Sequence, residues 1–394
     1  MINARELLRA TSVKDLNRAR VIRAVMVQPA PQNRIAQLTM LSEATVSTTV
    51  RSLVTEGALA TEPGPDRSKW VRLGDDVRGV AVGVDLGYTR VTVAVRNVGE
   101  TRIHVATEAA GLDVGQPDWL DVTVDLIGTL VAEVDATPAD VVSIGMAEPG
   151  GVDPRDGVVT MQSMPPLVPA EGDPVTVLSR RLGLRVVADN NANLGAYAEF
   201  LYGSSRDASI LVYVWADSNI NAGIIIDGAI MRGANGFAGE LGHLTVDRNG
   251  PVCRCGSRGC LEAYIAERRL VDEVRAVYST GTRSMPTMPT TLDGVIERAV
   301  MGEPVDCMVL RDAGSHLGFA LAQLSNILNP DKIVIGGGLS EARDPRLLLD
   351  PLSDAFKQYA LRPVSQVPVM FTELGHEGPV RGAIALGLNS HQTA

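Results

Sequence analysis

Apolar positions near the start of the chain recur at helical spacing and predict three short helices. The first covers residues 15–27 and is ended by two prolines. The second covers about 32–38, and the third begins after Ser42, a favourable N-cap, and runs to about Glu56, where Gly57 follows. The apolar stripe of the first helix consists of Leu16, Val21, Ile22 and Val25.

A short turn at 39–41 separates the second and third helices, which is the arrangement of a helix-turn-helix. Residues 58–73 then alternate between apolar and polar and predict a β-hairpin. Residues 1–77 are therefore expected to form a winged helix-turn-helix head. A helical oligomerisation or regulatory module remains an alternative. The third helix is expected to turn inward Ala44, Val46, Val50, Leu53 and Val54.

The polar positions of the third helix and of the hairpin tip are candidate DNA contacts. Short hydroxyls at the start of a helix can reach base edges in a major groove, and Arg or Lys can contact phosphates. Because the helix carries a single Arg, the hairpin and the preceding arm are expected to supply much of the affinity. The predicted DNA-binding residues are Ser42, Thr45, Ser47, Thr48, Arg51, Arg67 and Lys69.

From residue 79 the periodicity changes to that of strands. Residues 79–98 contain two apolar runs separated by a turn at 85–87, and residues 209–230 repeat this arrangement. The repetition predicts two related α/β lobes with a cleft between them. A strand at 332–335 precedes the triple glycine at 336–338, beside which a nucleotide could lie. Helices are expected at 119–134, 175–182, 192–202, 261–278, 292–301 and 309–328.

Charge is distributed unevenly between the head and the body. Residues 1–78 hold twelve Lys and Arg and eight Asp and Glu, a net charge of +4, which leaves −14 for the rest of a chain whose total is −10. A basic head on an acidic body suggests that the head meets a polyanion. With 394 residues and 45% hydrophobic content, two or three globular domains are expected. Neither a leader-like apolar segment nor a membrane-length apolar run occurs, so a cytoplasmic protein without a membrane partner is expected.

Three of the four cysteines lie in one polar, glycine-punctuated segment. Cys253, Cys255 and Cys260 have C-x-C-x4-C spacing, and His243 precedes the first of them by ten residues. Buried cysteines usually lie in apolar runs, so this context favours a metal site over small buried residues or an oxidised pair, which remain the alternatives. Three thiolates and one imidazole form a closed tetrahedral zinc site. With four protein ligands the zinc is expected to be structural and to hold the loop, with its neighbouring glutamates, in place.

Together these motifs resemble the ROK family of repressors, open reading frames and sugar kinases, in particular its regulators with an N-terminal winged helix-turn-helix. The resemblance covers nearly the whole chain. Its segments are VGVDLGYTR at 82–90, AEPGGVD at 147–153, DNNAN at 189–193, GELGH at 239–243, CRCGSRGCLE at 253–262 and IVIGGGLS at 333–340. The resemblance implies a two-lobed α/β body of the actin- and hexokinase-like (ribonuclease H-like) ATPase fold. The first lobe is expected to comprise 78–190 and 378–394, and the second, with the zinc loop and oligomerisation helices, 191–377.

The resemblance also implies zinc bound by His243 and the three cysteines, and a sugar in the cleft between the lobes. Carboxylates and amides around a ring of hydroxyls can each form paired hydrogen bonds. His243 would bind zinc through one ring nitrogen and face the ligand with the other. The alternative is that Glu240 and Glu262 only support the zinc ligands or lie on the surface. Carried over by position, the sugar-binding residues are Gly150, Asn190, Asn191, Glu240, His243 and Glu262.

The chain departs from the family's kinases at the catalytic position and in both phosphate loops. The kinases have an Asp as general base where this chain has Asn191, and an amide does not accept a proton at neutral pH. Tyr88 replaces a glycine of the D-x-G-G-T motif. In the G-T-G-x-G-x-G loop, Asp217, Asn219 and Asn221 replace three glycines. Bulk and like charge both oppose ATP, so neither enzymatic activity nor an ATP cofactor is expected.

Three functions remain in view. The leading hypothesis is a sequence-specific transcriptional regulator of carbohydrate metabolism, a repressor, whose homodimer or homotetramer binds double-stranded operator DNA and responds to a sugar effector. Such a response requires the sugar to bind two conformations with different affinity. The first alternative is an ATP-dependent sugar kinase with an added DNA-binding head. The second is a regulator that no longer binds a sugar.

Overall fold

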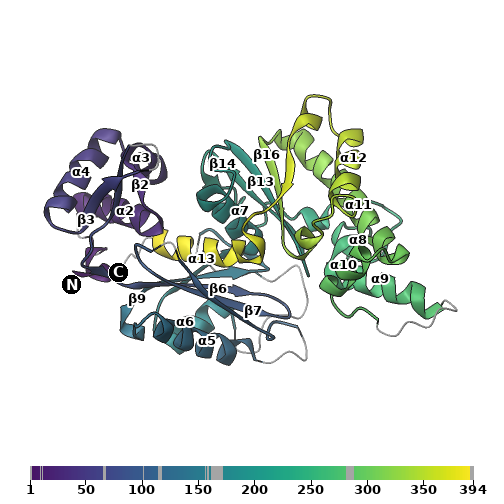
Figure 1. Ribbon diagram of the computed structural model, residues 1–394, viewed down its shortest axis with the longest axis horizontal. Coiled ribbons are helices and arrows are strands. Elements are labelled where there is room, and N and C mark those ends of the chain that lie inside the picture. The colour runs from purple at the N-terminus through teal and green to yellow at the C-terminus, as the bar shows by residue number, and fades with distance from the viewer. Residues whose placement is uncertain are drawn as a thin grey trace.

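The computed structural model of the chain describes residues 2–390 except 9, 11, 65–67, 101, 114–117, 156, 158, 161–171 and 281–287. Three units follow one another: a small N-terminal head and two α/β lobes (Figure 1). No helix among these residues is long and apolar enough to cross a membrane.

The head packs helices against a small antiparallel sheet of order β2-β4-β3. Ser42 caps α4, because its Oγ accepts a hydrogen bond from the Thr45 amide (3.2 Å). Met40, in the turn between α3 and α4, has the left-handed backbone conformation (φ 55°) that favours glycine. The elements are β1 (Ile2–Asn3), α1 (Ala4–Leu7), α2 (Val13–Val27), β2 (Ala30–Pro31), α3 (Gln32–Thr39), α4 (Glu43–Thr55), β3 (Leu59–Pro63), β4 (Lys69–Leu73) and β5 (Val77–Arg78).

The two lobes contain sheets of the same topology, in agreement with the repeat predicted from the sequence. The strand order is β8-β7-β6-β9-β12 in the first lobe and β15-β14-β13-β16-β17 in the second. In each sheet a central antiparallel hairpin is followed by two parallel strands. Residues that directly follow β6, together with the β13–β14 turn, line a hollow between the lobes.

The elements of the lobes have the following bounds. In the first lobe they are β6 (Val80–Leu86), β7 (Val91–Asn97), β8 (His104–Glu108), α5 (Trp119–Glu133), β9 (Val141–Glu148), β10 (Gly151–Val152), β11 (Val159–Thr160), α6 (Pro174–Leu182), β12 (Val186–Asn190) and α13 (Gly378–Asn389). In the second lobe they are α7 (Asn191–Tyr202), β13 (Ile210–Ala216), β14 (Ile220–Ile226), β15 (Ala229–Ile230), α8 (Glu262–Ile265), α9 (Glu267–Thr280), α10 (Leu292–Val300), α11 (Pro304–Leu328), β16 (Lys332–Gly336), α12 (Leu349–Tyr359) and β17 (Val369–Phe371).

Helices α7 and α13 lie at the junction of the head and the two lobes (Figure 1). Glycines allow α13 to approach its neighbours closely. A side chain at Gly145 of β9 would collide with the Ala383 carbonyl, and one at Gly382 would collide with the Leu194 carbonyl of α7. Buried apolar residues of α2, α7 and α13 belong to one contiguous core. The head and both lobes therefore share a core at this junction.

The structure corrects several details of the predicted elements. Ala44 and Val54 of α4 are exposed, because the helix turns only the stripe at 46, 50 and 53 toward the core. Leu16 is likewise 42% exposed. The single helix predicted at 261–278 is two helices, α8 and α9, because Ala266 between them has an extended backbone.

Candidate metal centre and binding cleft

One histidine and three cysteines converge in the second lobe. The ligand atoms of His243, Cys253, Cys255 and Cys260 lie within 4.8 Å of one another, and no disulfide joins these cysteines. Cys255 Sγ is 3.7 Å from Cys260 Sγ, and Cys253 Sγ is 3.8 Å from His243 Nδ1. Two thiolates at about 2.3 Å from a tetrahedral zinc are about 3.8 Å apart, so the donor set and its spacing fit zinc.

Local backbone contacts shape the loop that carries these ligands. Thr245 and Cys260 form an isolated antiparallel β-bridge, which places the end of the loop against its beginning. Gly259 has φ 69° and lies so close to the Asp247 carbonyl that a side chain there would collide with it. The loop buries few apolar side chains besides its cysteines. A metal cross-link is the kind of constraint that such a loop needs to be ordered.

Four of the predicted sugar-binding residues form a polar chain that ends at the metal centre. Asn190 Nδ2 donates to the Gly150 carbonyl (3.1 Å). The Asn221 amide, oriented by its partners, accepts from Asn190 Nδ2 (3.3 Å) and donates to Glu240 Oε2 (3.2 Å). Glu240 Oε2 is 3.8 Å from Nε2 of His243, the ring nitrogen on the side away from the cysteines. Nδ1 of His243 thus lies on the side of the cysteines and Nε2 on the side of Glu240.

The other two predicted residues join this network through the start of β14. Asn191 Nδ2 is 3.5 Å from Asn219 Oδ1, and Glu262 Oε2 accepts from the Ile220 amide (3.1 Å). Arg254 donates two hydrogen bonds, of 2.8 and 3.1 Å, to the Glu262 carboxylate. Glu262 is only 5% exposed, so a surface position for this glutamate is wrong.

The cleft beside this network contains a hollow of about 820 Å³. Tyr88 of the first lobe and Arg254 and Glu262 of the second are among the residues that line it. The Arg254 guanidinium lies over the Tyr88 ring, 4.8 Å from its centre. The hollow is thus within the size range of small-molecule sites and is bounded by both lobes.

Burial raises the pKa of two carboxyl groups near the cleft. The pKa of Glu240 is raised to about 7, first by burial and second by the charge of Glu262. Burial raises the pKa of Glu148 well above its usual range, and the carboxylates of Asp173 and Asp85 contribute. Glu148 is fully buried, and neither of its carboxyl oxygens has a hydrogen-bond partner among the described residues. Glu148 therefore keeps its proton to higher pH than an exposed glutamate does.

Replacing Glu148 by glutamine is expected to stabilise the protein increasingly as the pH rises. Folded Glu148 keeps its proton at pH values where the unfolded chain has lost it, so the wild-type protein loses stability between the unfolded and the folded pKa. The loss is at most about 1.4 kcal/mol per pH unit for one group. Urea unfolding at pH 5 and pH 8 measures it. A variant whose advantage is equal at both pH values would contradict this account of Glu148.

The loop after β6 and the loop after β13 meet across the cleft. Arg90, just before β7, forms an ion pair with Asp217, just after β13. Asp217 Oδ2 also accepts from the Gly338 amide (3.3 Å) of the triple-glycine turn, and His376 Nδ1 is 4.0 Å from it. The charged groups of these loops are thus paired with one another across the cleft.

The predicted DNA-binding residues that the structure describes belong to α4, to its N-cap and to the start of β4. Thr45 and Ser47 are half-buried, and Thr45 Oγ1 lies 2.8 Å from the hydroxyl of Ser42. Arg67 lies outside the described residues. The exposed members of the set are Ser42, Thr48, Arg51 and Lys69.

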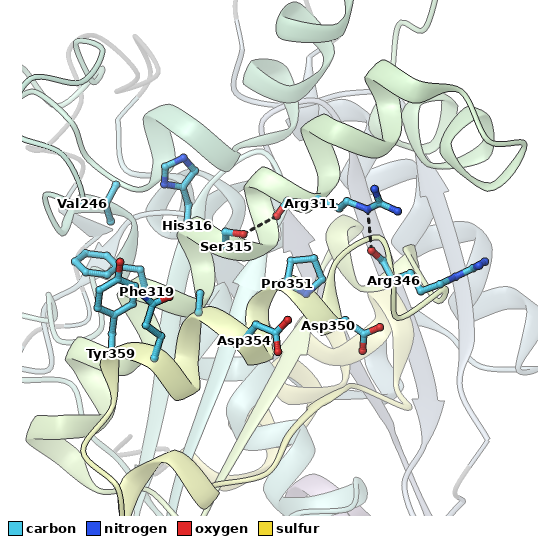
Figure 2. A pocket seen from close by; sticks show the side chains of 12 residues that line it. Val246, Arg311, Ser315, His316, Phe319, Arg346, Asp350, Pro351, Asp354 and Tyr359 are labelled. Atoms are coloured by element: carbon cyan, nitrogen blue, oxygen red, sulfur yellow. Dashed lines mark hydrogen bonds between the residues drawn. The ribbon is translucent and has the colours of Figure 1, made fainter.

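A second hollow, of about 700 Å³, lies between α11 and α12 (Figure 2). His316 and Phe319 of α11 and Asp354 and Tyr359 of α12 are among the residues that face it. It shares no lining residue with the cleft, and none of the predicted site residues lines it.

Asn221 and Arg254 belong to the network but are absent from the sequence-based set. From the sequence, Asn221 is interpreted only as the replacement of a glycine in the G-T-G-x-G-x-G loop. Its identity was a usable signal, because an amide that replaces a phosphate-loop glycine brings hydrogen-bonding groups into the cleft. Arg254 offered no such signal, since its contact with Glu262 depends on the folded path of the loop.

A helical head joined to two duplicated lobes, with a centre of one histidine and three cysteines beside the cleft, defines the class of protein. The chain belongs to the ROK family, whose profile matches residues 81–390. The xylose repressor of Caldicellulosiruptor bescii is 29% identical to it, over 95% of this chain and 96% of the repressor.

Two solved structures resemble the protein over different lengths. A ROK family transcriptional regulator, described as a homolog of the E. coli Mlc protein, covers 96% of this chain and 97% of its own at 22% identity and a TM-score of 0.72. A ROK family glucokinase from Streptomyces griseus, in complex with glucose and AMPPNP, covers 79% of this chain and 100% of its own at 26% identity and a TM-score of 0.66. The regulator therefore matches more of this chain than the kinase does.

Proposed function

We propose that the protein is a transcriptional repressor that responds to a sugar. The observation that carries the proposal is the polar network of the cleft, which connects amides and carboxylates of both lobes to the metal centre. The similarity to a protein named xylose repressor, which extends over 95% of this chain, supports it. The sugar is proposed to bind Gly150, Asn190, Asn191, Glu240, His243 and Glu262.

The metal is proposed to be a structural zinc held by His243, Cys253, Cys255 and Cys260. Bound there, it supplies a rigid cross-link and no open coordination position. Because His243 directs Nδ1 toward the cysteines, its Nε2 remains on the side of Glu240. The proposed sugar-binding residues thus orient the sugar, and the loop that carries the metal ligands keeps His243 and Glu240 in position.

The head is proposed to bind operator DNA within a homodimer. α4 follows α3 after a three-residue turn and exposes Thr48 and Arg51, and Lys69 at the start of β4 is also exposed. In a two-fold dimer the two heads would meet two half-sites of a palindromic operator. The added length that distinguishes this chain from the glucokinase is consistent with a separate DNA-binding unit.

An enzymatic role is disfavoured by the residues around Asn191. The neighbouring carboxylate of Asp189 is 2% exposed and forms an ion pair with Arg232 (2.6 Å). It also accepts a hydrogen bond from Asn193 Nδ2 (2.8 Å). This carboxylate is therefore engaged and does not substitute for the missing general base.

Replacing Asn191 by Asp is expected not to create a sugar kinase. The substitution restores a base but leaves Tyr88 and the ion pair of Arg90 with Asp217 on the phosphate side of the cleft. A coupled assay with ATP and D-glucose or D-xylose should show no turnover by the wild-type protein or by N191D. Turnover by the wild-type protein that is lost in Asn191→Ala would establish the kinase instead.

Binding-site sequencing on genomic DNA, followed by anisotropy measurements on the recovered operator, tests the proposed function. D-xylose or D-glucose should change operator affinity about 5- to 150-fold. Glu262→Gln should weaken calorimetric binding of the active sugar about 10- to 100-fold, because a charge-assisted hydrogen bond is lost. The exposed Glu133→Gln serves as the matched control. An operator bound equally with and without every sugar tested would favour a ligand-independent regulator.

A further inference from the structure

Helix α7 begins in the polar network of the cleft and ends against the head. Its N-cap is Asn190 and its first residue is Asn191, both members of the polar network. Its last turn contains Phe200 and Leu201, which contact the head. The helix has 12 residues and is therefore about 18 Å long. A single rigid element thus spans the distance between the two proposed sites.

The contacts at the far end of α7 involve two helices of the head. Arg34 of α3 lies over the Phe200 ring, with its guanidinium carbon 4.7 Å from the ring centre. Gln28, which ends α2, donates from Nε2 to the Leu201 carbonyl (3.3 Å). α3 leads through the turn at Met40 into α4, the helix with the predicted base contacts. A displacement of this end of α7 therefore acts on the helix pair that would meet DNA.

The contact of Arg34 with Phe200 has the properties of one that breaks and re-forms readily. Its Nη2 is buried without a hydrogen-bond partner among the described residues, while Nη1 reaches Gln37 Oε1 (3.3 Å). Burial, together with the nearby charge of Arg206, lowers the pKa of Arg34. A buried cation with an unsatisfied donor recovers hydration when it returns to water. When Arg34 leaves Phe200 for water, its guanidinium therefore regains part of the hydration free energy that burial had cost.

A second attachment of the head does not involve the cleft. Arg96 of β7 is 4% exposed and donates to the carbonyls of Met26 (2.9 Å) and Val27 (3.0 Å) at the end of α2. These bonds satisfy carbonyls that a helix end leaves free and place a positive charge at its negative pole. Besides the core that α2 shares with α7 and α13, the head is thus held by the hydrogen bonds of Arg96 to the first lobe and by the contacts of Arg34 and Gln28 with α7.

We propose that α7 transmits effector binding to the head, with Phe200 against Arg34 as its output contact and the Arg96 attachment as the pivot. The inference rests on the proposed function, because the sugar is taken to bind Asn190 and Asn191. A sugar that bonds these amides competes with their bonds to the Gly150 carbonyl and to Asn219. The start of α7 then shifts, and the rigid helix carries Phe200 away from Arg34. The head is docked in the free protein and reoriented in the sugar-bound protein.

Variants at the output contact test this role in the full-length protein. Phe200→Leu keeps an apolar side chain but removes the ring, and Arg34→Gln removes the charge. Both variants should bind D-xylose or D-glucose, whichever acts on the wild-type protein, within about threefold of wild-type affinity. The sugar should change their operator affinity less than twofold, against five-fold or more in the wild-type protein. Arg180→Gln, which removes an exposed cation of α6 in the first lobe, should retain the wild-type response.

Hydrogen exchange supplies a second readout that does not depend on a variant. On addition of the active sugar to the wild-type protein, the amides of residues 32–39 should exchange faster, while those of α2 near Arg96 should not change. Unaltered exchange in α3 together with a full sugar response in Phe200→Leu overturns the role of α7 and leaves the proposed function intact. A wild-type protein whose operator affinity no sugar changes contradicts both.

Discussion

Replacing Cys260 by serine is expected to remove the proposed zinc from the protein and to weaken sugar binding about 10- to 100-fold, the range seen when the surroundings of a metal ligand are disturbed. Cys260 is fully buried, its Sγ lies 3.7 Å from that of Cys255, and its backbone forms the bridge that closes the loop. Loss of the ion frees His243, and with it the orientation of Glu240. Elemental analysis of zinc per chain, thermal unfolding and calorimetric sugar titration measure the effect.

The fourth cysteine provides the matched control for this experiment. Cys307 lies outside the cluster, and its Sγ contacts the Ala299 carbonyl (3.2 Å) between α10 and α11. Cys307→Ser should therefore keep one zinc per chain and wild-type sugar affinity. If Cys260→Ser retains both the metal and the sugar affinity, the closed four-ligand centre is wrong.

Raising the salt concentration from 50 to 200 mM is expected to weaken operator binding by about 10³-fold. The predicted phosphate contacts are Arg51, Arg67 and Lys69, which gives six in a dimer and a steep dependence on released counterions. Arg51→Ala should lower the slope of log affinity against log salt by about two, one unit for each protomer. Fluorescence anisotropy on the recovered operator at several salt concentrations gives the slope.

A matched exposed arginine separates this effect from the general charge of the protein. The side chain of Arg268 is 92% exposed, and its helix, α9, lies far from the head in the second lobe (Figure 1). Arg268→Ala should leave the salt slope unchanged. An operator affinity that is independent of salt, or a slope that falls equally in both variants, would argue against the assigned phosphate contacts.

Local chemistry allowed several parts of the structure to be predicted from the sequence. Ser42 was identifiable as an N-cap because a short hydroxyl there satisfies a free helix amide. The spacing of Cys253, Cys255 and Cys260 implied that all three bind one metal ion, and the structure places their sulfur atoms together. The repeat of an apolar hairpin at 79–98 and 209–230 gave the duplicated sheets.

Other parts depend on tertiary packing and could not be predicted. Helical periodicity gives the spacing of a buried stripe but not its width, so Ala44 and Val54 were assigned inward although both are exposed. The ion pair of Arg90 with Asp217 joins residues 127 positions apart, and nothing in either loop identifies the other. The contact of Arg34 with Phe200 depends in the same way on how the head docks.

The position of α13 has a consequence for the order in which the protein is assembled on the ribosome. Of the described elements it is the last in the chain, yet it packs against β6 and β9, against α7 and against α2. Until α13 has left the ribosomal tunnel, an apolar face of the first sheet stays uncovered, and α2 lacks the helix against which it packs. The nascent chain therefore exposes these apolar surfaces until α13 has been made, and the docking of the head is completed only with that helix.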